Sequence, residues 1–273
     1  MVNAIYPKTL EDAVAAKSDN TALVPYAGGT DWMVNRRPGT PLLFLNYIPA
    51  LREIRREGGE LVIGACCTYT GLLESGEIPA ILRQAVIEVA SPAIRNLGTL
   101  GGNICNASPA GDTLPPLYAL DARVRLASAS GKRELPIASF IQGVRKTALA
   151  GGELLEAVII PNKEFSRSYY KKVGARNAVA ISKASFAGLM SVEKGRVASI
   201  SMAFGSVAAT VVRRPEIEAS LCGKTARELA EQKDEIASMY DPFILPIDDQ
   251  RSTADYRKRV CMALLKDFLL QEG

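Results

Sequence analysis

The sequence predicts an α+β protein, with alternating short strands and helices in its first part and a small sheet covered by helices in its last part. Up to about residue 160, short apolar runs are bounded by Gly, Pro and Asn, which is typical of buried strands. Residues 185–191 and 197–204 alternate around Glu193-Lys194-Gly195, which favours an antiparallel hairpin. Residues 225–239 and 254–270 have helical spacing, and a sheet followed by helices is an α+β arrangement.

The helices expected in the first part begin at residues suited to a helix start. Thr9 precedes a helix-like segment that carries acidic residues in its first turn, and Thr68 is placed to cap a short helix that ends near Glu74. The clearest helix is Pro79–Ala90, because proline suits the first turn and the apolar residues form one stripe. The other expected elements are strands at Leu42–Leu45, Glu60–Ala65, Val124–Ala127, Leu135–Ile137 and Leu154–Ile160, helices at Leu10–Ala16 and Leu114–Leu120, and a last helix with Tyr256, Val260, Leu264 and Phe268 on one side.

Length, charge and hydropathy exclude several classes of protein. With 273 residues, of which 48% are hydrophobic, the chain can bury a substantial core and form two domains. The net charge is +4 with both signs interspersed, so no run of like charge indicates a nucleic-acid-binding surface. No apolar stretch is long enough to cross a bilayer, and the start of the chain lacks the apolar segment of a signal peptide. We therefore expect a cytoplasmic protein with neither nucleic acid nor membrane as a partner.

The chain has five cysteines and no histidine. An odd number of cysteines without a secretory signal favours reduced thiols, and the lack of a CxxC motif argues against an iron–sulfur or zinc site. Cys66, Cys67 and Cys105 are therefore expected to act as small buried hydrophobic residues. Without histidine, the commonest general base is missing, so we expect neither a metal site nor catalytic side chains and favour a bound redox cofactor.

The most informative segment is Thr99–Asp112, the second glycine stretch, with the sequence TLGGNICNASPAGD. Paired glycines let the backbone adopt positive φ and approach a ligand closely. Side chains such as Thr99 and Asn103 can donate hydrogen bonds to oxygens, and Asp112 can accept one from a ribose or ribityl hydroxyl. The composition indicates the wall of a nucleotide site, although a glycine-rich turn with capping Ser and Asp residues would look similar.

A second segment with paired glycines, Tyr26–Trp32, follows an apolar run and is called the first glycine stretch. Exposed amides in such a loop form a concave anion site that suits a pyrophosphate. Neither segment fits the P-loop pattern GxxxxGK[ST] or the GxGxxG pattern of dinucleotide-binding folds. Two separated glycine stretches therefore suggest a long ligand held across a cleft.

The two stretches, AGGTDWMV and TLGGNICNASPAGD, resemble those of the FAD-binding medium subunits of molybdenum hydroxylases, the xanthine dehydrogenase family. The resemblance continues through Glu153–Pro161, Tyr170–Arg176 and Met202–Ala208 to Leu221–Lys224, so it covers nearly the whole chain. It implies a two-part FAD-binding domain at 1–163, with subdomains of about 1–57 and 58–163, followed by a small α+β domain at 164–273.

The resemblance also implies which residues bind FAD. Asp31 is placed to order its own loop as readily as to touch the ligand, and Trp32 is either a stacking residue or part of the core. Asp112 is expected near ribityl or ribose hydroxyls or as a helix cap, and Lys172 near the reduced flavin or a phosphate, with Lys171 on the opposite face of the strand. Arg176 is expected in a salt bridge or interface. The complete set of implied FAD-binding residues is Pro25, Tyr26, Ala27, Gly28, Gly29, Thr30, Asp31, Trp32, Val89, Thr99, Gly101, Gly102, Asn103, Asp112, Leu155 and Lys172.

By the same resemblance, the chain is an oxidoreductase subunit that takes electrons from iron–sulfur clusters through FAD to NAD⁺ or another acceptor. Molybdopterin and two-iron clusters are then expected on partner subunits within a hetero-oligomer. Two alternatives remain open. One is a self-contained FAD-dependent reductase of the same fold, similar to the peptidoglycan-precursor reductase, and the other is a non-enzymatic module that has lost FAD.

Overall fold

The computed structural model describes residues 4–271, which belong to two compact units. Among the described residues, unit 1 consists of 4–78, 91–107 and 121–162, and unit 2 of 79–90, 108–120 and 163–271. The mixture of helices and sheets confirms the α+β class. Two segments that the sequence assigns to the N-terminal domain, 79–90 and 108–120, belong to unit 2, and the domain boundaries stay a prediction.

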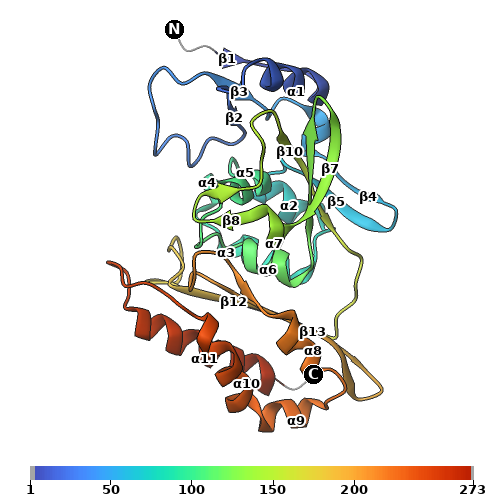
Figure 1. The fold of residues 1–273 in the computed structure, drawn as a ribbon, viewed down its shortest axis with the longest axis vertical. Coiled ribbons are helices and arrows are strands. Elements are labelled where there is room, and N and C mark those ends of the chain that lie inside the picture. Colours follow the sequence, from blue (N-terminus) through green and yellow to red (C-terminus); the bar gives the residue numbers. More distant parts are fainter. Residues whose placement is uncertain (1–3, 272–273) are drawn as a thin grey trace. The chain divides into compact units, whose positions relative to one another are not determined.

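Unit 1 contains two main sheets (Figure 1). A three-stranded parallel sheet has the order β1-β3-β2, and a five-stranded antiparallel sheet has the order β4-β5-β10-β6-β7. The strands of unit 1 are β1 (Ala4–Ile5), β2 (Val24–Tyr26), β3 (Leu42–Phe44), β4 (Ile54–Glu57), β5 (Glu60–Gly64), β6 (Arg123–Ser128), β7 (Gly131–Pro136), β8 (Ile141–Gly143), β9 (Lys146–Thr147) and β10 (Leu154–Ile160). Because β4 pairs with β5, the two sheets divide before β4, whereas the sequence predicts a subdomain boundary after it, near residue 57.

Helix α1 shares one apolar core with both sheets of unit 1. Leu10, Ala13 and Val14 of α1 lie in a buried cluster with Leu43 of β3 and Leu154 of β10. The expected cap is present, because Thr9 Oγ1 accepts a hydrogen bond from Asp12 N at 3.1 Å. The helices of unit 1 are α1 (Leu10–Asp19), η1 (Pro49–Arg52), α2 (Tyr69–Ser75), α4 (Pro92–Arg95), α5 (Leu100–Asn106) and α7 (Ile137–Phe140).

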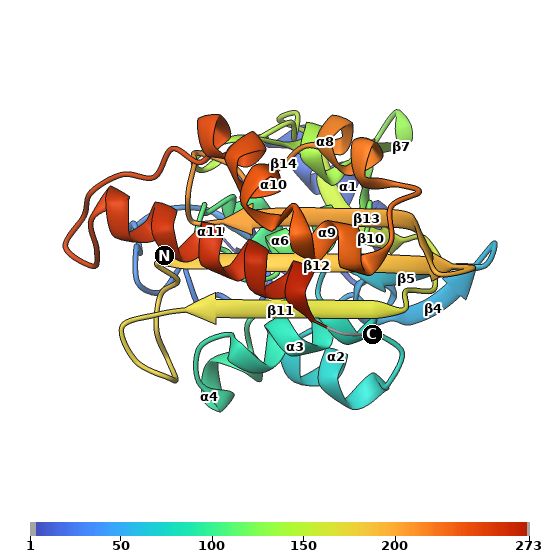
Figure 2. The same cartoon turned by 90° about the horizontal axis from the view of Figure 1, so that it is seen from below.

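Unit 2 is built on one antiparallel sheet of order β11-β12-β13-β14, and Figure 2 shows α10 and α11 in front of its strands. One face of the sheet carries Phe186, Met202 and Phe204, which are fully buried against Leu265 and Phe268 of α11. The elements of unit 2 are β11 (Arg167–Val173), β12 (Ala184–Glu193), β13 (Arg196–Gly205), β14 (Val212–Arg213), α3 (Ala80–Glu88), α6 (Leu114–Ala119), α8 (Pro215–Leu221), α9 (Ala226–Glu231), α10 (Lys233–Tyr240), η2 (Asp241–Phe243) and α11 (Ala254–Leu270).

Three features of the structure differ from what the sequence led us to expect. The second glycine stretch contains helix α5, although its sequence shows no helical period. The single helix expected at 225–239 is divided at Gln232, whose amide closes α9 on Glu228 O before α10 begins. In α11 the buried face includes Arg257 and Cys261, whereas Tyr256 is exposed, so the buried face is rotated from the expected one.

Candidate functional site

The first glycine stretch leaves β2 where the parallel sheet ends, and its backbone amides are unpaired. Within residues 4–271, the amides of Ala27 to Trp32 donate to no acceptor, although Leu45 N donates to Tyr26 O at 2.8 Å just before them. Gly29 has φ +70°, a conformation that side chains disfavour. Six consecutive amides without acceptors are the kind of donors that anion-binding loops use.

Gly28 is required by packing inside the chain. A Cβ atom at Gly28 would lie 1.7 Å from the backbone oxygen of Leu97. The first glycine stretch therefore rests against the backbone that leads into the second. A Cβ atom at Gly29 would lie 1.9 Å from the hydroxyl of Tyr26, whose ring packs on Phe44 at 4.6 Å between centroids. The Tyr26 side chain thus packs directly against the backbone of Gly29.

The second glycine stretch begins as helix α5, and its amides are already used. Gly101 N donates to Ala65 O at 3.0 Å, and Gly102 N donates to Thr99 Oγ1 at 3.1 Å. A Cβ atom at Gly101 would lie 2.5 Å from the same Ala65 oxygen. The expectation that these two amides donate to a phosphate is therefore not supported, because the glycines serve close packing and capping within the chain. Thr99 is the cap of α5, and its hydroxyl is buried.

Three further predicted residues of unit 1 are Asp31, Trp32 and Leu155. The Asp31 carboxylate does not accept from the amides of its own loop within residues 4–271, where only its backbone oxygen accepts, from Val34 N at 3.2 Å and Asn35 N at 3.3 Å. The carboxylate instead accepts from Asn106 Nδ2 at 3.3 Å. Trp32 is only partly buried and lies outside the main apolar clusters. Leu155 lies in β10 next to a register irregularity between Leu155 and Ala157, and its side chain is buried. Such bulges change the direction of neighbouring groups and are common beside binding sites.

Pro25, Thr30 and Asn103 complete the predicted set in unit 1. Pro25 lies in β2, Thr30 follows the glycine pair, and Asn103 lies in α5. The side chains of Thr30 and Asn103 are partly buried, whereas Pro25 is exposed.

In unit 2 the predicted residues Asp112 and Lys172 form a buried ion pair. Lys172 Nζ lies 2.6 Å from Asp112 Oδ2 and donates to Glu88 O at 3.0 Å. Ser182 Oγ donates to Asp112 Oδ1 at 2.6 Å. Burial raises the pKa of Asp112, and the ammonium of Lys172 and the Ser182 hydroxyl oppose that rise. The pair holds β11, the end of α3 and the end of the second glycine stretch together.

Strand alternation separates the two neighbouring lysines as expected. The Lys172 side chain is only 5% exposed, whereas Lys171 is exposed to solvent. Val89, which follows α3, is buried beside the carbonyl that Lys172 contacts. Asp112 does not cap α6, which contradicts one of its two expected roles, because both its oxygens bind Lys172 and Ser182.

Sequence reasoning missed Ser182, Glu88, Asn106 and Arg145. Asn106 lies within the second glycine stretch, so its position was a usable signal, but Ser182 follows Lys172 by ten positions in a segment without a motif. Glu88 contributes its backbone carbonyl, which no sequence pattern marks. Arg176, expected in a salt bridge or interface, donates to Val179 O at 2.6 Å and forms no ion pair within residues 4–271, so only its place in an interface stays a prediction.

Two of the three cysteines expected to be buried are buried, whereas Cys105 is only partly buried. Cys66 and Cys67 are buried, and burial raises the pKa of the Cys66 thiol to about 12 and that of Cys67 to about 11. Among residues 4–271, no group of three or more His, Cys, Asp or Glu side chains has the arrangement of a metal site. The same residues include no helix that is long and apolar enough to span a membrane.

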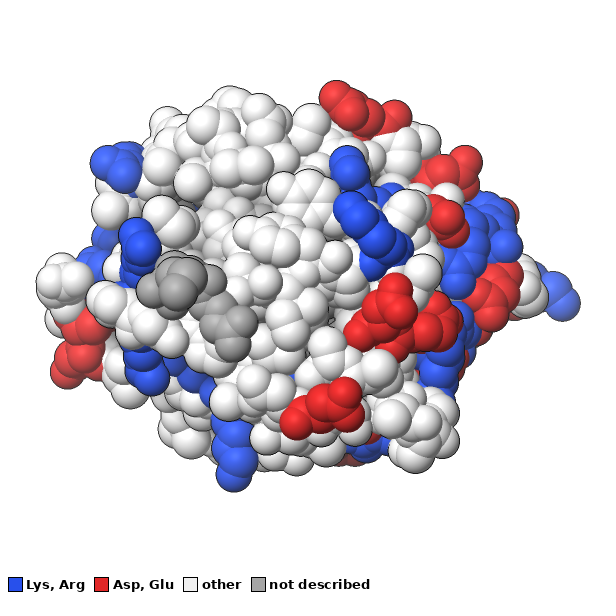
Figure 3. Space-filling view, turned by 90° about the horizontal axis from the view of Figure 1, so that it is seen from above, with Lys and Arg blue, Asp and Glu red and all other residues white. Residues whose placement is uncertain are grey.

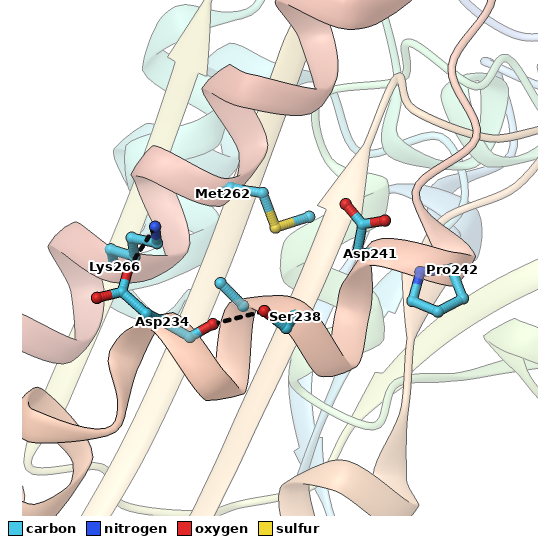
Figure 4. A pocket seen from close by; sticks show the side chains of 7 residues that line it. Asp234, Ser238, Asp241, Pro242, Met262 and Lys266 are labelled. Atoms are coloured by element: carbon cyan, nitrogen blue, oxygen red, sulfur yellow. Dashed lines mark hydrogen bonds and ion pairs between the residues drawn. The ribbon is translucent and has the colours of Figure 1, made fainter.

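A separate pocket of about 410 Å³ lies between α10, η2 and α11 (Figure 4). Asp234 and Lys266 form an ion pair of 2.6 Å at its edge, and Met262 lies on the α11 side. None of the predicted cofactor residues lines this pocket. On the molecular face drawn in Figure 3, acidic and basic side chains stand close to one another around uncharged areas, with no large basic patch.

Comparison with known proteins finds two family models that together cover most of the chain. Residues 1–163 match the family model of the FAD binding domain in molybdopterin dehydrogenase, and residues 168–272 match that of the CO dehydrogenase flavoprotein C-terminal domain. The chain is 33% identical over 216 residues to a putative xanthine dehydrogenase FAD-binding subunit of Escherichia coli, an alignment that covers 75% of this chain and 74% of the relative.

Two further similarities extend over nearly the whole chain. The carbon monoxide dehydrogenase medium chain of Afipia carboxidovorans is 30% identical over 269 residues, which cover 95% of this chain and 92% of the relative. A solved structure of reconstituted CO dehydrogenase from Oligotropha carboxidovorans superimposes with a TM-score of 0.90 at 28% identity, covering 98% of this chain and 96% of the other.

Proposed function

The chain belongs to the family of FAD-binding subunits of the molybdopterin dehydrogenases, and we propose that within such an enzyme it holds FAD and delivers electrons to NAD⁺ or another acceptor. It is the flavoprotein component of an oxidoreductase, in a family whose relatives are medium subunits of molybdenum hydroxylases. The molybdopterin and the iron–sulfur clusters belong to partner subunits.

The free amides of the first glycine stretch are the observation that carries this proposal. FAD contains a diphosphate, and six amides without acceptors form a donor set that fits it. When bound, FAD accepts two electrons and can release them as a hydride. The protein supplies position and electrostatics for that chemistry.

Each cluster has a distinct part in holding FAD. The amides of Ala27 to Trp32 are proposed to donate to the diphosphate, and Asp112 is proposed to accept from ribityl or ribose hydroxyls. Lys172 is proposed to place its positive charge near the flavin or a phosphate. The buried ion pair keeps Lys172 in one position, since its ammonium is bound by Asp112 and by Glu88 O.

Substrate recognition is not proposed for this chain. It contains no histidine, and its thiols next to the second glycine stretch have pKa values raised far above neutral pH. Histidine, the commonest general base, is therefore absent from the two described clusters. We propose that the xanthine- or nicotinate-like substrate is bound by the molybdopterin-binding partner.

The proposal is tested with the purified chain alone and with the complex that co-purifies with it. The chain alone should show a flavin absorption spectrum without iron or molybdenum, and NADH should reduce its flavin. A heterocyclic substrate should reduce the flavin only in the complex. Reduction of the flavin by such a substrate in the isolated chain would indicate a self-contained reductase, and absence of bound FAD after reconstitution would indicate a module without cofactor.

A further inference from the structure

We propose that Asn106 and Arg145 are positioning residues for the first glycine stretch, and that they act by balancing the charge of Asp31 beside the free amides. The inference rests on the proposed function, because the ligand in question is the diphosphate of FAD. Both residues lie in unit 1, as does the stretch they support.

Three side chains from three separate segments form one network. Asn106 is the last residue of α5, and its Nδ2 donates to Asp31 Oδ1 at 3.3 Å. Its Oδ1 accepts from Arg145 Nη1 at 2.9 Å. The same guanidinium nitrogen lies 3.6 Å from Asp31 Oδ2. Asn106 therefore links the Asp31 carboxylate to the Arg145 guanidinium. Asn106 and Arg145 both contact Asp31.

The backbone holds Arg145 in place for this contact. Arg145 lies in the turn between β8 and β9 with φ +54°, and its amide donates to Ala107 O at 3.0 Å. Ala107, the residue after α5, has φ +45°. Left-handed conformations of non-glycine residues cost free energy, and they persist where the surrounding structure requires them. Two such residues joined by a hydrogen bond fix the hairpin against the end of α5.

The network matters for ligand binding because Asp31 carries a negative charge. A carboxylate among free amides would itself compete for them and would repel a diphosphate that approaches the same loop. The bonds to Asn106 and Arg145 hold the carboxylate away from the amides, none of which it accepts from. Arg145 also cancels its charge. The Asp31 and Arg145 side chains are 51% and 59% exposed, so solvent screening limits the effect to a modest one.

The chain offers a matched control on the same hairpin. Lys146 is adjacent to Arg145, is exposed, and forms no ion pair with any residue in the described part of the chain. Lys146→Met therefore removes one positive charge from the same turn without touching Asp31. Arg145→Lys keeps the charge but loses the planar guanidinium that reaches Asn106 and Asp31 together.

The test measures FAD affinity by titrating apoprotein with FAD, alongside the melting temperature of each apoprotein. Arg145→Met should weaken FAD binding about fivefold, which is the upper range for an exposed pair, Arg145→Lys less, and Lys146→Met not at all. Asn106→Ala should weaken binding to a similar extent. Asp31→Asn should restore most of the affinity when it is combined with Arg145→Met, because the charge to be balanced is then gone.

Each result discriminates between the possible failures. Wild-type affinity in both Arg145→Met and Asn106→Ala overturns the positioning role and leaves the FAD site standing. A loss in Arg145→Met that persists unchanged in the Asp31→Asn background also overturns it, since Arg145 would then act on FAD without Asp31. Failure of the wild-type apoprotein to bind FAD overturns the proposed function, and this inference with it.

Discussion

The two glycine stretches look alike in sequence but differ in what they offer a ligand. In the first, Ala27 to Trp32 present amides that have no acceptor within residues 4–271. In the second, the amides of Gly101 and Gly102 are bonded to Ala65 O and to the Thr99 hydroxyl. What distinguishes the end of the second stretch is the side chain of Asp112, which is paired with Lys172.

The difference shows that paired glycines have two separate uses. At Gly28 and Gly101 the missing Cβ allows backbone to pass backbone, with distances from the virtual Cβ to a carbonyl oxygen of 1.7 and 2.5 Å. Whether a loop amide is free to bind a ligand depends on which acceptors the rest of the chain places beside it. A pair of glycines does not guarantee that the amide is free. Substitution of a glycine therefore cannot by itself reveal which loop binds the diphosphate.

The largest effect is expected from the buried pair that ends the second stretch. Lys172→Met leaves the Asp112 carboxylate buried without its partner and should lower the free energy of unfolding by about 3 kcal/mol. Lys171→Met, on the exposed face of β11, should change it by less than about 0.5 kcal/mol. Denaturant unfolding of the two apoproteins measures this difference, and FAD titration should show the same order. Equal effects of the two substitutions would contradict the assignment of Lys172 to the inner face.

The next effect concerns the packing of the first stretch. Gly28→Ala forces a Cβ atom against the Leu97 carbonyl and should cost about 2 kcal/mol of stability even without FAD. Gly102→Ala meets only the Thr99 hydroxyl, at 2.8 Å, and lies in a helix, where alanine is favourable, so its cost should be small. Thermal unfolding of the apoproteins measures both. A Gly28→Ala protein as stable as wild type would show that the stretches do not pack as described.

Hydrogen exchange separates free from paired amides directly. In apoprotein, the amides of residues 27–32 should exchange at least about tenfold faster than those of Gly101 and Gly102, because only the latter are hydrogen-bonded. FAD should slow exchange in 27–32 and leave the two glycine amides of α5 nearly unchanged. Mass spectrometry of peptides from the two stretches measures this. If FAD slowed amide exchange only at the start of α5, the second glycine stretch and not the first would supply the amides that bind FAD.

The smallest effect is expected from the two threonines that flank the glycine pairs. Thr99→Ala removes the cap of α5 and should cost about 1 kcal/mol of stability, while Thr99→Ser should retain the cap. Thr30→Ala should leave stability nearly unchanged, because no hydrogen bond of its hydroxyl is found within residues 4–271. Any loss in Thr30→Ala should therefore appear in FAD affinity. A stability loss in Thr30→Ala that matches Thr99→Ala would show that both threonines are caps.

Local signals predicted many of the elements. Thr9 and Thr68 cap their helices as expected. Each hydroxyl oxygen accepts a hydrogen bond of 3.1 Å from the backbone amide three residues further along the chain. The hairpin around Lys194 forms β12 and β13, and Pro79 precedes α3. These features depend on residues within a few positions of each other, so the sequence contains the relevant information. Helix α5 was missed because its start depends on Ala65 O and other acceptors about 35 positions away.

The sequence by itself determined the α+β class, the presence of two glycine stretches and the placement of Lys171 and Lys172 on opposite faces of a strand, because these follow from local order and alternation. Its motifs also determined the family, through their resemblance to those of known subunits. Only the tertiary structure decided which amides are free, that Asp112 pairs with Lys172 across 60 positions, and that Asn106 and Arg145 hold Asp31. The physical reason is that a hydrogen bond is satisfied by whichever partner the fold brings within about 3 Å, and sequence spacing does not fix that partner.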